Sequence, residues 1–188
     1  MKSLNTIQVL SKIGKVLSKI MFICSIIGFC GCLIGIISLK LGANLWEIYG
    51  ENLNDILQRE SDLTENTLYG TMIVGMILLA GEAVVAKFSE HYFKRELEDG
   101  TPFNLAGAKE MFILGILIIC IPLGTQFIAE IFYAILREFL TDVQPIELGG
   151  YASVGIGSMF ILTSLICRYG AEVIESKEVK DTEEEIVE

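Results

Sequence analysis

Two acidic residues interrupt long apolar stretches of the sequence, and they are the residues best placed to do chemistry. Glu82 lies inside the apolar segment 68–88, and Glu130 lies inside the apolar segment 111–136. If both segments cross a bilayer as helices, each carboxylate lies about 9 Å from an end of its segment, at 1.5 Å per residue, but the two ends face opposite sides. The two carboxylates therefore cannot act as an acid/base pair or share one metal ion.

Glu130 belongs to a row of polar side chains that advances by four, three and four residues, which places them on one face of a helix. Pro122 precedes the row and removes a backbone donor, so we expect a kink there. Two interpretations stay open: a ligand or proton site in an outward-opening cavity, or a hydrogen-bond network that only holds helices together. The row consists of Gln126, Glu130, Tyr133 and Arg137.

Glu82 has few polar neighbours on its own segment, so we expect its partner on another one. Ser164 and Arg168 project one turn apart from the inner half of segment 148–168. The sequence therefore predicts an intramembrane ion pair between Glu82 and Arg168. A carboxylate left unpaired at that depth would be protonated instead.

No set of residues typical of an enzyme or a metal site stands out. His91 is the single histidine, and the cysteines lie in or at the ends of apolar segments, as small buried side chains do. We therefore expect a protein that is not an enzyme and holds neither a metal ion nor a cofactor. The cysteines are Cys24, Cys30, Cys32, Cys120 and Cys167.

The composition is that of a membrane protein. The chain has 188 residues, of which 52% are hydrophobic and 20% charged, with a mean hydropathy of +0.56. Four apolar segments are long enough to cross the hydrocarbon core as helices, which takes about 20 residues. We predict an all-α, integral membrane four-helix bundle over residues 1–172, followed by an acidic tail over 173–188. The predicted spans are residues 20–39, 68–88, 111–136 and 148–168.

Basic residues indicate the orientation of these spans. Eleven lysines and arginines flank the N-terminus, the second connection and the end of the fourth span, against three in the first and third connections. Because cytoplasmic loops carry an excess of Lys and Arg, we expect a multi-pass protein of the cell membrane with both termini in the cytoplasm.

The segment before the first span carries apolar residues at helical spacing, with lysines mostly elsewhere. This pattern predicts an amphipathic helix over residues 4–20 that lies on the inner leaflet, and a simple basic flank is the alternative. The following apolar run is longer than the 7–15 residues of a signal peptide, so we do not expect cleavage. The apolar positions are Leu4, Ile7, Leu10, Ile13, Leu17 and Ile20.

The second connection is predicted to form a stiff cytoplasmic helical hairpin. The second helix is expected to continue to about Asp99, and Gly100 is placed to end it. Thr101 or Asn104 can then cap the next helix. The hairpin is either a structural element or a docking surface.

The net charge of −10, from 14 basic and 24 acidic residues, excludes direct binding of nucleic acid. The residues after Gly170 include eight acids and two lysines and so contribute −6. Such a tail suits a basic cytoplasmic protein partner, for example a small DNA-binding regulator. The lipid bilayer is the other expected partner, and small residues four apart, such as Ser153 and Gly157, allow close packing within one chain or a homodimer.

Two short motifs resemble those of a bacterial family. GTPFN at residues 100–104 lies between spans two and three, and RYGAE at residues 168–172 ends span four. Both are similar to the signatures of the YoaS-like proteins, four-span inner-membrane proteins that carry a domain of unknown function. The resemblance implies the four-span plan. It also implies a regulatory role, because such proteins are often encoded beside a small Cro-type helix-turn-helix protein. The acidic end of that family finishes in an Asp-Leu-Thr run, which this sequence lacks.

Two functions follow from these features. The first is a non-enzymatic sensor or regulatory protein that acts with a cytoplasmic partner, such as a helix-turn-helix protein. The alternative is a small transporter, or an immunity protein against a membrane-active peptide, that uses an intramembrane carboxylate.

Overall fold

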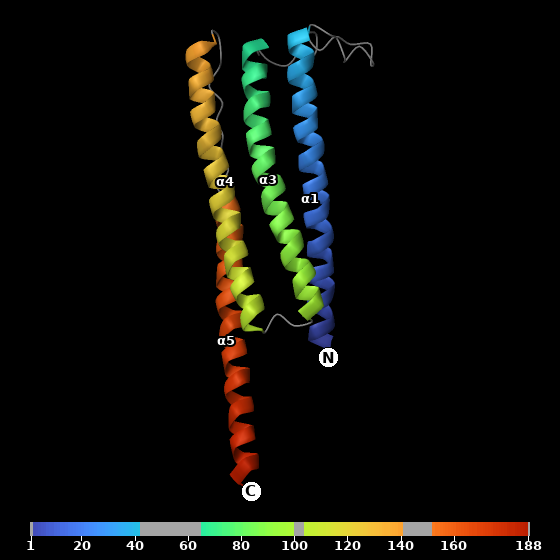
Figure 1. Ribbon diagram of the computed structural model, residues 1–188, viewed down its shortest axis with the longest axis vertical. Helices are drawn as coiled ribbons and strands as arrows, with labels where there is room; N and C mark the ends of the chain where they lie inside the picture. Colours follow the sequence, from blue (N-terminus) through green and yellow to red (C-terminus); the bar gives the residue numbers. More distant parts are fainter. Residues whose placement is uncertain (1, 42–64, 100–103, 141–151, 188) are drawn as a thin grey trace. The chain divides into compact units, whose positions relative to one another are not determined.

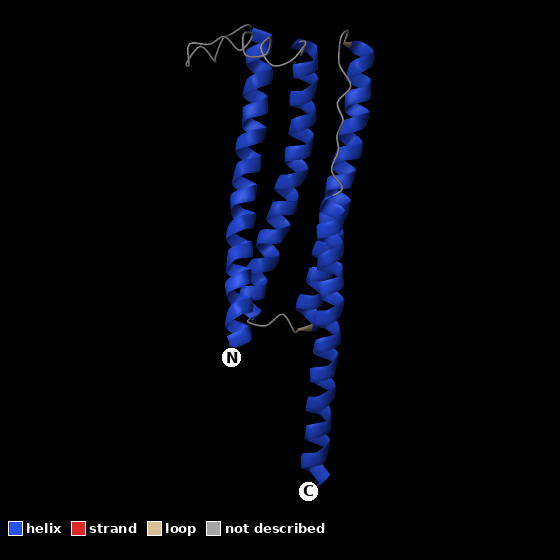
Figure 2. Cartoon of the chain, turned by 180° about the vertical axis from the view of Figure 1, so that it is seen from behind, coloured by secondary structure: helices blue, strands red, loops and turns tan. Residues whose placement is uncertain are grey.

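The described part of the chain is helical throughout. The computed structural model describes residues 2–41, 65–99, 104–140 and 152–187, and no strand occurs among them (Figures 1 and 2). The prediction of an all-α protein is confirmed for these residues. The helices are α1 (Lys2–Leu41), α3 (Glu65–Asp99), α4 (Leu105–Phe139) and α5 (Ala152–Val187).

Each of the four helices contains a stretch long and apolar enough to cross a membrane. These stretches cover the predicted spans with two differences at the ends. The first stretch ends at Ser38, one residue before the predicted end, and the fourth span was expected to start at residue 148, but residues 148–151 lie outside the described residues. By length and composition, the described residues therefore contain four helices that could span a membrane, as a multi-pass membrane protein requires. The stretches are Gln8–Ser38, Asn66–Glu98, Leu105–Phe139 and Ala152–Ser176.

The N-terminal segment differs from the prediction in one way. Residues 4–20 form no separate helix, because α1 continues without a break to Leu41. The apolar side chains that were expected to meet the inner leaflet face away from the protein: Leu10 and Leu17 are 67% and 56% exposed. Ser11 and Ser18 face inward instead and are 4% and 8% exposed.

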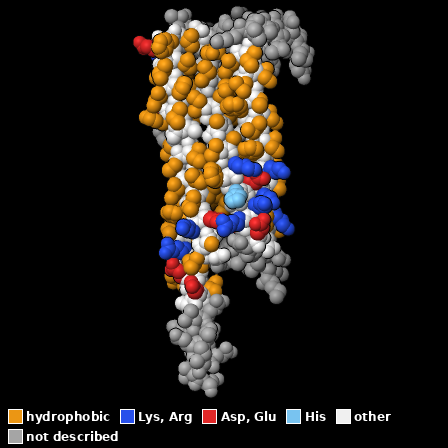
Figure 3. All heavy atoms as spheres, viewed as in Figure 1, with side chains coloured by type: hydrophobic (Ala, Val, Ile, Leu, Met, Phe, Trp, Pro, Cys, Tyr) orange, Lys and Arg blue, Asp and Glu red, His pale blue; other side chains and the backbone are white. Residues whose placement is uncertain are grey.

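Exposed apolar side chains are not confined to this segment. Large apolar side chains of all four helices are exposed, and they cover much of the face shown in Figure 3. In lipid, bulky apolar side chains gain little by turning inward, whereas small residues allow helix backbones to approach closely. The inward-facing hydroxyl group of Ser18 is satisfied within its own helix, because its Oγ donates to the carbonyl oxygen of Gly14 at 2.8 Å.

The contacts within the chain divide it into two compact units. The first unit consists of Met1–Met21, Val84–Ile121 and Gly150–Glu188, and the second consists of Phe22–Ala83 and Pro122–Gly149. Helices α1, α3 and α4 contribute residues to both units, whereas α5 belongs to the first unit alone.

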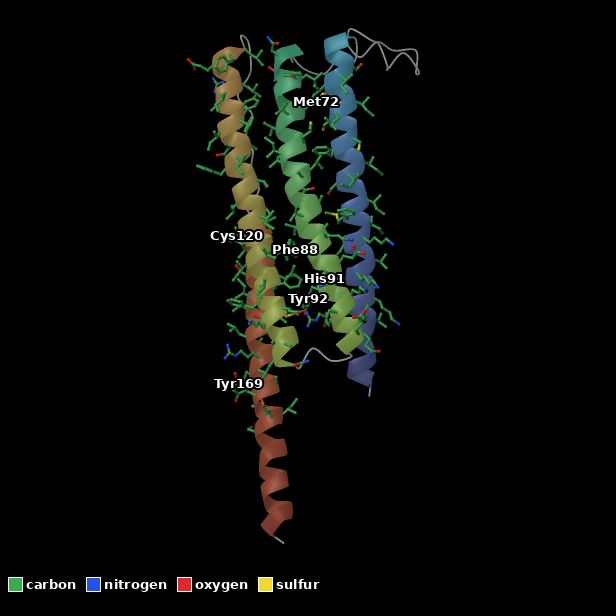
Figure 4. All side chains as sticks on the ribbon, viewed as in Figure 1. Met72, Phe88, His91, Tyr92, Cys120 and Tyr169 are labelled. Atoms are coloured by element: carbon green, nitrogen blue, oxygen red, sulfur yellow. The ribbon has the colours of Figure 1, made fainter. Side chains whose placement is uncertain are left out.

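In the second unit, large side chains of one helix lie against glycines of another. A Cβ added to Gly35 of α1 would lie 2.7 Å from the Cε of Met72, which extends from α3 (Figure 4). A Cβ added to Gly70 of α3 would lie 3.1 Å from the ring of Tyr133 of α4. Tyr133 is buried in a small core with Val74 and Ala129. An added Cβ at Gly35 would displace the flexible end of Met72, and one at Gly70 would require the Tyr133 ring to shift by a few tenths of an ångström. Both glycines therefore allow the helices to pack closely.

In the first unit, α4 and α5 meet backbone to backbone. A Cβ added to Gly157 would lie 2.7 Å from the carbonyl oxygen of Gly115, and one added to Gly115 would lie 2.9 Å from that of Gly157. Backbone atoms cannot rotate aside as a side chain can, so this crossing fixes the spacing of the two helices. Beside it, Tyr92, Leu114 and Ile118 form the core of the unit.

An alanine at Gly157 tests this crossing. We expect Gly157→Ala to lower the free energy of unfolding by about 1–3 kcal/mol, because the added methyl group overpacks the contact. Gly155→Ala on the same helix is the matched control, since an added Cβ there meets no heavy atom within 4 Å. The control should be neutral or stabilising by up to about 1 kcal/mol. Denaturant unfolding in detergent measures the free energy of unfolding of both variants. Equal effects of the two substitutions would contradict the close contact between α4 and α5 at Gly157.

Candidate functional site

Helix α4 is capped at its start by Asn104, one of the two residues that the sequence offered for this role. The side-chain Oδ1 of Asn104 accepts a hydrogen bond from the backbone N–H of Ala106 at 3.1 Å, and the backbone carbonyl oxygen of Asn104 accepts one from the backbone N–H of Ala108 at 2.9 Å. An oxygen in this position satisfies a donor that the first turn of a helix leaves free. The second helix was expected to continue to about Asp99, and α3 is described to that residue. The other alternative, Thr101, lies outside the described residues with Gly100.

The two helices that flank this connection are joined by an ion pair. Arg95 of α3 binds Glu110 of α4, with about half of the Arg95 side chain exposed. A second pair, between Lys87 and Glu90 at 2.8 Å, lies within α3. Exposed pairs of this kind contribute little to stability, so they orient the helices more than they hold them.

A third carboxylate of α3 has a different environment. Glu96 is half-buried and accepts hydrogen bonds from the hydroxyl groups of Ser11 and Tyr92. Ser11 belongs to α1, and Tyr92 lies one turn before Glu96 on α3 (Figure 4). Both donors are less than a tenth exposed. The carboxylate therefore links α1 to α3 inside the first unit.

Glu96 opens onto a groove of about 390 Å³ that lies largely between α1 and α5. Leu10 and Leu17 line it from α1, and Met159 and Phe160 line it from α5. Phe93 and Met111 add apolar surface from α3 and α4. The polar lining residues are Ser11, Glu96 and Thr163. We call this cavity the Glu96 groove.

The groove has the size and lining of a binding site. Its volume is in the range of small-molecule sites, which are mostly apolar with a few polar groups that fix orientation. Thr163 Oγ1 donates to the carbonyl oxygen of Met159 at 2.8 Å, so this hydroxyl is engaged within its own helix. Within the described ranges, no group of three or more His, Cys, Asp or Glu side chains is placed to hold a metal ion. The arrangement suits a ligand with an apolar body and a positive charge.

The row predicted on α4 divides into two parts. Gln126 Nε2 donates to Glu130 Oε1 at 3.3 Å, and Glu130 is exposed. Tyr133 instead turns inward, onto the core of the second unit, and interacts electrostatically with Arg137. The reason is geometric: Tyr133 follows the buried Ala129 by four residues, which places these two on the same face of the helix.

The proposed partners Glu82 and Arg168 belong to different units, so their pairing stays a prediction. Glu82 is exposed on α3 in the second unit. In the first unit, Arg168 Nε donates to Glu172 Oε1 at 3.0 Å, one turn further along α5. Ser164, one turn earlier, is buried and donates to the carbonyl oxygen of Ile161 at 2.6 Å.

Sequence reasoning did not identify Glu96 as a site residue. It stands in a run of charged residues at the end of α3, where a carboxylate is usually solvated. One signal could have indicated it: Ser11, Ser18 and Ser25 recur every seven residues on α1, which marks a polar face that packs against other helices.

No family model, curated protein or solved structure matches this chain. The resemblance of its two motifs to the YoaS-like proteins therefore stays a prediction. RYGAE lies on α5, whereas only Asn104 of GTPFN is among the described residues.

Removal of the Glu96 carboxylate tests its structural role. We expect Glu96→Ala to lower the free energy of unfolding by about 1–3 kcal/mol, because two largely buried hydroxyl groups lose their acceptor. Glu98→Ala is the control, since Glu98 is exposed and pairs with Lys94 only at 3.9 Å. The control should stay within about 0.5 kcal/mol of the wild type. The free energy of unfolding is measured in detergent. If both substitutions lower it equally, Glu96 is solvated and the structural role is contradicted.

Proposed function

We propose that this protein is a non-enzymatic sensor or regulatory protein of the cell membrane. In this proposal it binds an amphiphilic cation in the Glu96 groove and reports to a basic cytoplasmic partner. One observation carries the proposal. Helix α5, which forms one wall of the groove through Met159 and Phe160, continues as a single helix to Val187, through the acidic end of the chain.

The ligand class follows from the surroundings of Glu96. A carboxylate beside apolar side chains interacts with a cation more strongly than it would in water, because little solvent screens the charges. The exposed apolar residues Leu10 and Leu17 provide contact area for the body of the ligand. An amphiphilic cation satisfies both features, and a neutral or anionic ligand would leave the carboxylate without a counter-charge.

The way in which ligand binding would reach the cytoplasmic partner follows from the continuity of α5. A ligand shifts a conformational equilibrium only if it binds one arrangement more tightly than the other. A molecule held between α1 and α5 contacts both helices, so its affinity depends on how α5 lies in the first unit. Because the residues after Gly170 carry −6, a change in α5 would alter how this charge meets a basic protein.

Exposed basic residues support the proposed orientation, with both termini and the α3–α4 hairpin in the cytoplasm. Lys87, Lys94 and Arg95 all have more than half of their side chains exposed. On the face shown in Figure 3, basic side chains gather around His91. A cytoplasmic position of this cluster agrees with the excess of Lys and Arg on that side of membrane proteins. The resemblance to a regulatory family points the same way.

The hydrogen bond between Gln126 and Glu130 supports the alternative, a small transporter or an immunity protein against a membrane-active peptide. That function requires an intramembrane carboxylate in a cavity, whereas Glu82 and Glu130 are both exposed. Because Glu96 lies in a groove, the geometry favours the sensor.

Tetraphenylphosphonium, a lipophilic cation that does not form micelles, tests the ligand class. We expect the full-length protein in lipid nanodiscs to bind it, and Glu96→Gln to weaken binding by about tenfold or more, because the counter-charge is lost. Glu98→Gln removes one charge from the same helix and should leave the affinity unchanged. Equilibrium dialysis measures all three proteins. Equal affinities for the wild type and Glu96→Gln would contradict the proposal.

Recovery of a cytoplasmic partner tests whether the acidic end of α5 binds a basic protein. We expect the native protein in mild detergent to retain a basic cytoplasmic protein at low salt and to release it as salt rises, because exposed charges are screened. A variant with Glu183, Glu184 and Glu185 all changed to Gln should lose that protein, whereas Lys177→Gln should keep it. Retention of no cytoplasmic protein at low or moderate salt would argue against a regulatory role.

A further inference from the structure

A second groove of the first unit lies between α4 and α5 and differs in charge from the Glu96 groove. Its volume is about 460 Å³. Lys109 lines it from α4 and Arg168 lines it from α5, so two basic side chains from different helices meet at one cavity. The remaining lining residues are Leu105, Ala108, Phe112, Ser164 and Leu165. We call it the Lys109–Arg168 groove.

Both basic groups can reach a ligand. Lys109 and Arg168 are exposed. Glu172 binds the Nε of Arg168 at 3.0 Å, and this bond uses one of the five N–H donors of the guanidinium. Glu172 therefore orients Arg168 without consuming its capacity to bind an anion.

Apolar residues adjoin the basic pair on both helices. Phe112 follows Lys109 by three residues on α4, and Leu165 precedes Arg168 by three on α5. Both are exposed, and both belong to stretches able to cross a membrane. The groove thus presents two positive charges at one level and apolar surface one turn away on each helix.

We propose that the Lys109–Arg168 groove binds an anionic phospholipid, with the headgroup phosphate between the two basic side chains and an acyl chain along Phe112 and Leu165. Basic pockets between transmembrane helices are a known means of holding anionic headgroups. A free phosphate would use the two charges but not the apolar surface. This inference does not rest on the sensor function, since the two grooves differ in lining residues and in charge.

Lipid binding to the purified full-length protein tests the proposal. Native mass spectrometry in mild detergent compares titrations with phosphatidylglycerol and phosphatidylcholine. We expect phosphatidylglycerol to bind more tightly. A variant with Lys109→Gln and Arg168→Gln should weaken its binding by about 30-fold, toward that of phosphatidylcholine, because two basic groups near an anionic headgroup are lost.

Two further variants make the result specific. Exchange of the two basic types, Lys109→Arg with Arg168→Lys, keeps both charges and should retain the preference for phosphatidylglycerol. Lys12→Gln with Lys19→Gln removes two exposed lysines from α1 and should leave the affinity close to that of the wild type. Equal loss in this control and in the Lys109/Arg168 variant would overturn the proposal in favour of unspecific charge attraction.

Two further comparisons distinguish a lipid headgroup from free inorganic phosphate as the ligand of the groove. We expect millimolar inorganic phosphate to leave bound phosphatidylglycerol in place, because phosphate makes no contact with Phe112 or Leu165. Displacement of the lipid by inorganic phosphate would overturn the proposal and assign the groove to a free anion. Equal affinity for phosphatidylglycerol and phosphatidylcholine would overturn it as well, since the charge pair would then not select the headgroup.

Discussion

Close approach of helix backbones at small residues is the constraint on which the rest of this structure depends. Gly115 and Gly157 bring α4 and α5 together so tightly that a single methyl group would meet a carbonyl oxygen. In the second unit, Gly35 and Gly70 accept large side chains from neighbouring helices. Because lipid tails are as apolar as leucine, such packing takes the place of the hydrophobic effect between helices in a membrane. The bulky apolar side chains are then free to point outward, as they do here.

This arrangement leaves room for polar groups inside the first unit, provided that each has a partner. Ser18 and Ser164 bind carbonyl oxygens of their own helices, and Glu96 takes hydroxyl donors from two helices. Burial of a carboxylate is costly unless it accepts such bonds, so the donors permit Glu96 to stand beside an apolar groove. The same requirement limits what the groove can bind, because a ligand must match both the apolar lining and the negative charge.

Much of the fold could be predicted from the sequence, because the length of apolar runs and the capping of helix ends are local properties. The positions of the four helices and the cap at Asn104 are of this kind. Periodicity showed which residues of α1 share a face, but it did not show that they belong to one helix that continues unbroken to Leu41. Glu96 was not found, because its donor Ser11 lies on another helix, far away in the sequence, and the serine repeat on α1 marks only the face that packs.

The central claim is that the Glu96 groove controls the acidic end of α5. Hydrogen exchange of the backbone amides of residues 173–187, with and without saturating tetraphenylphosphonium, tests it most directly. The account predicts that the ligand changes exchange in this segment of the wild-type protein and leaves it unchanged in Glu96→Gln, because only the wild type holds the cation against α5. Exchange that stays the same in the wild type at saturation would contradict the account.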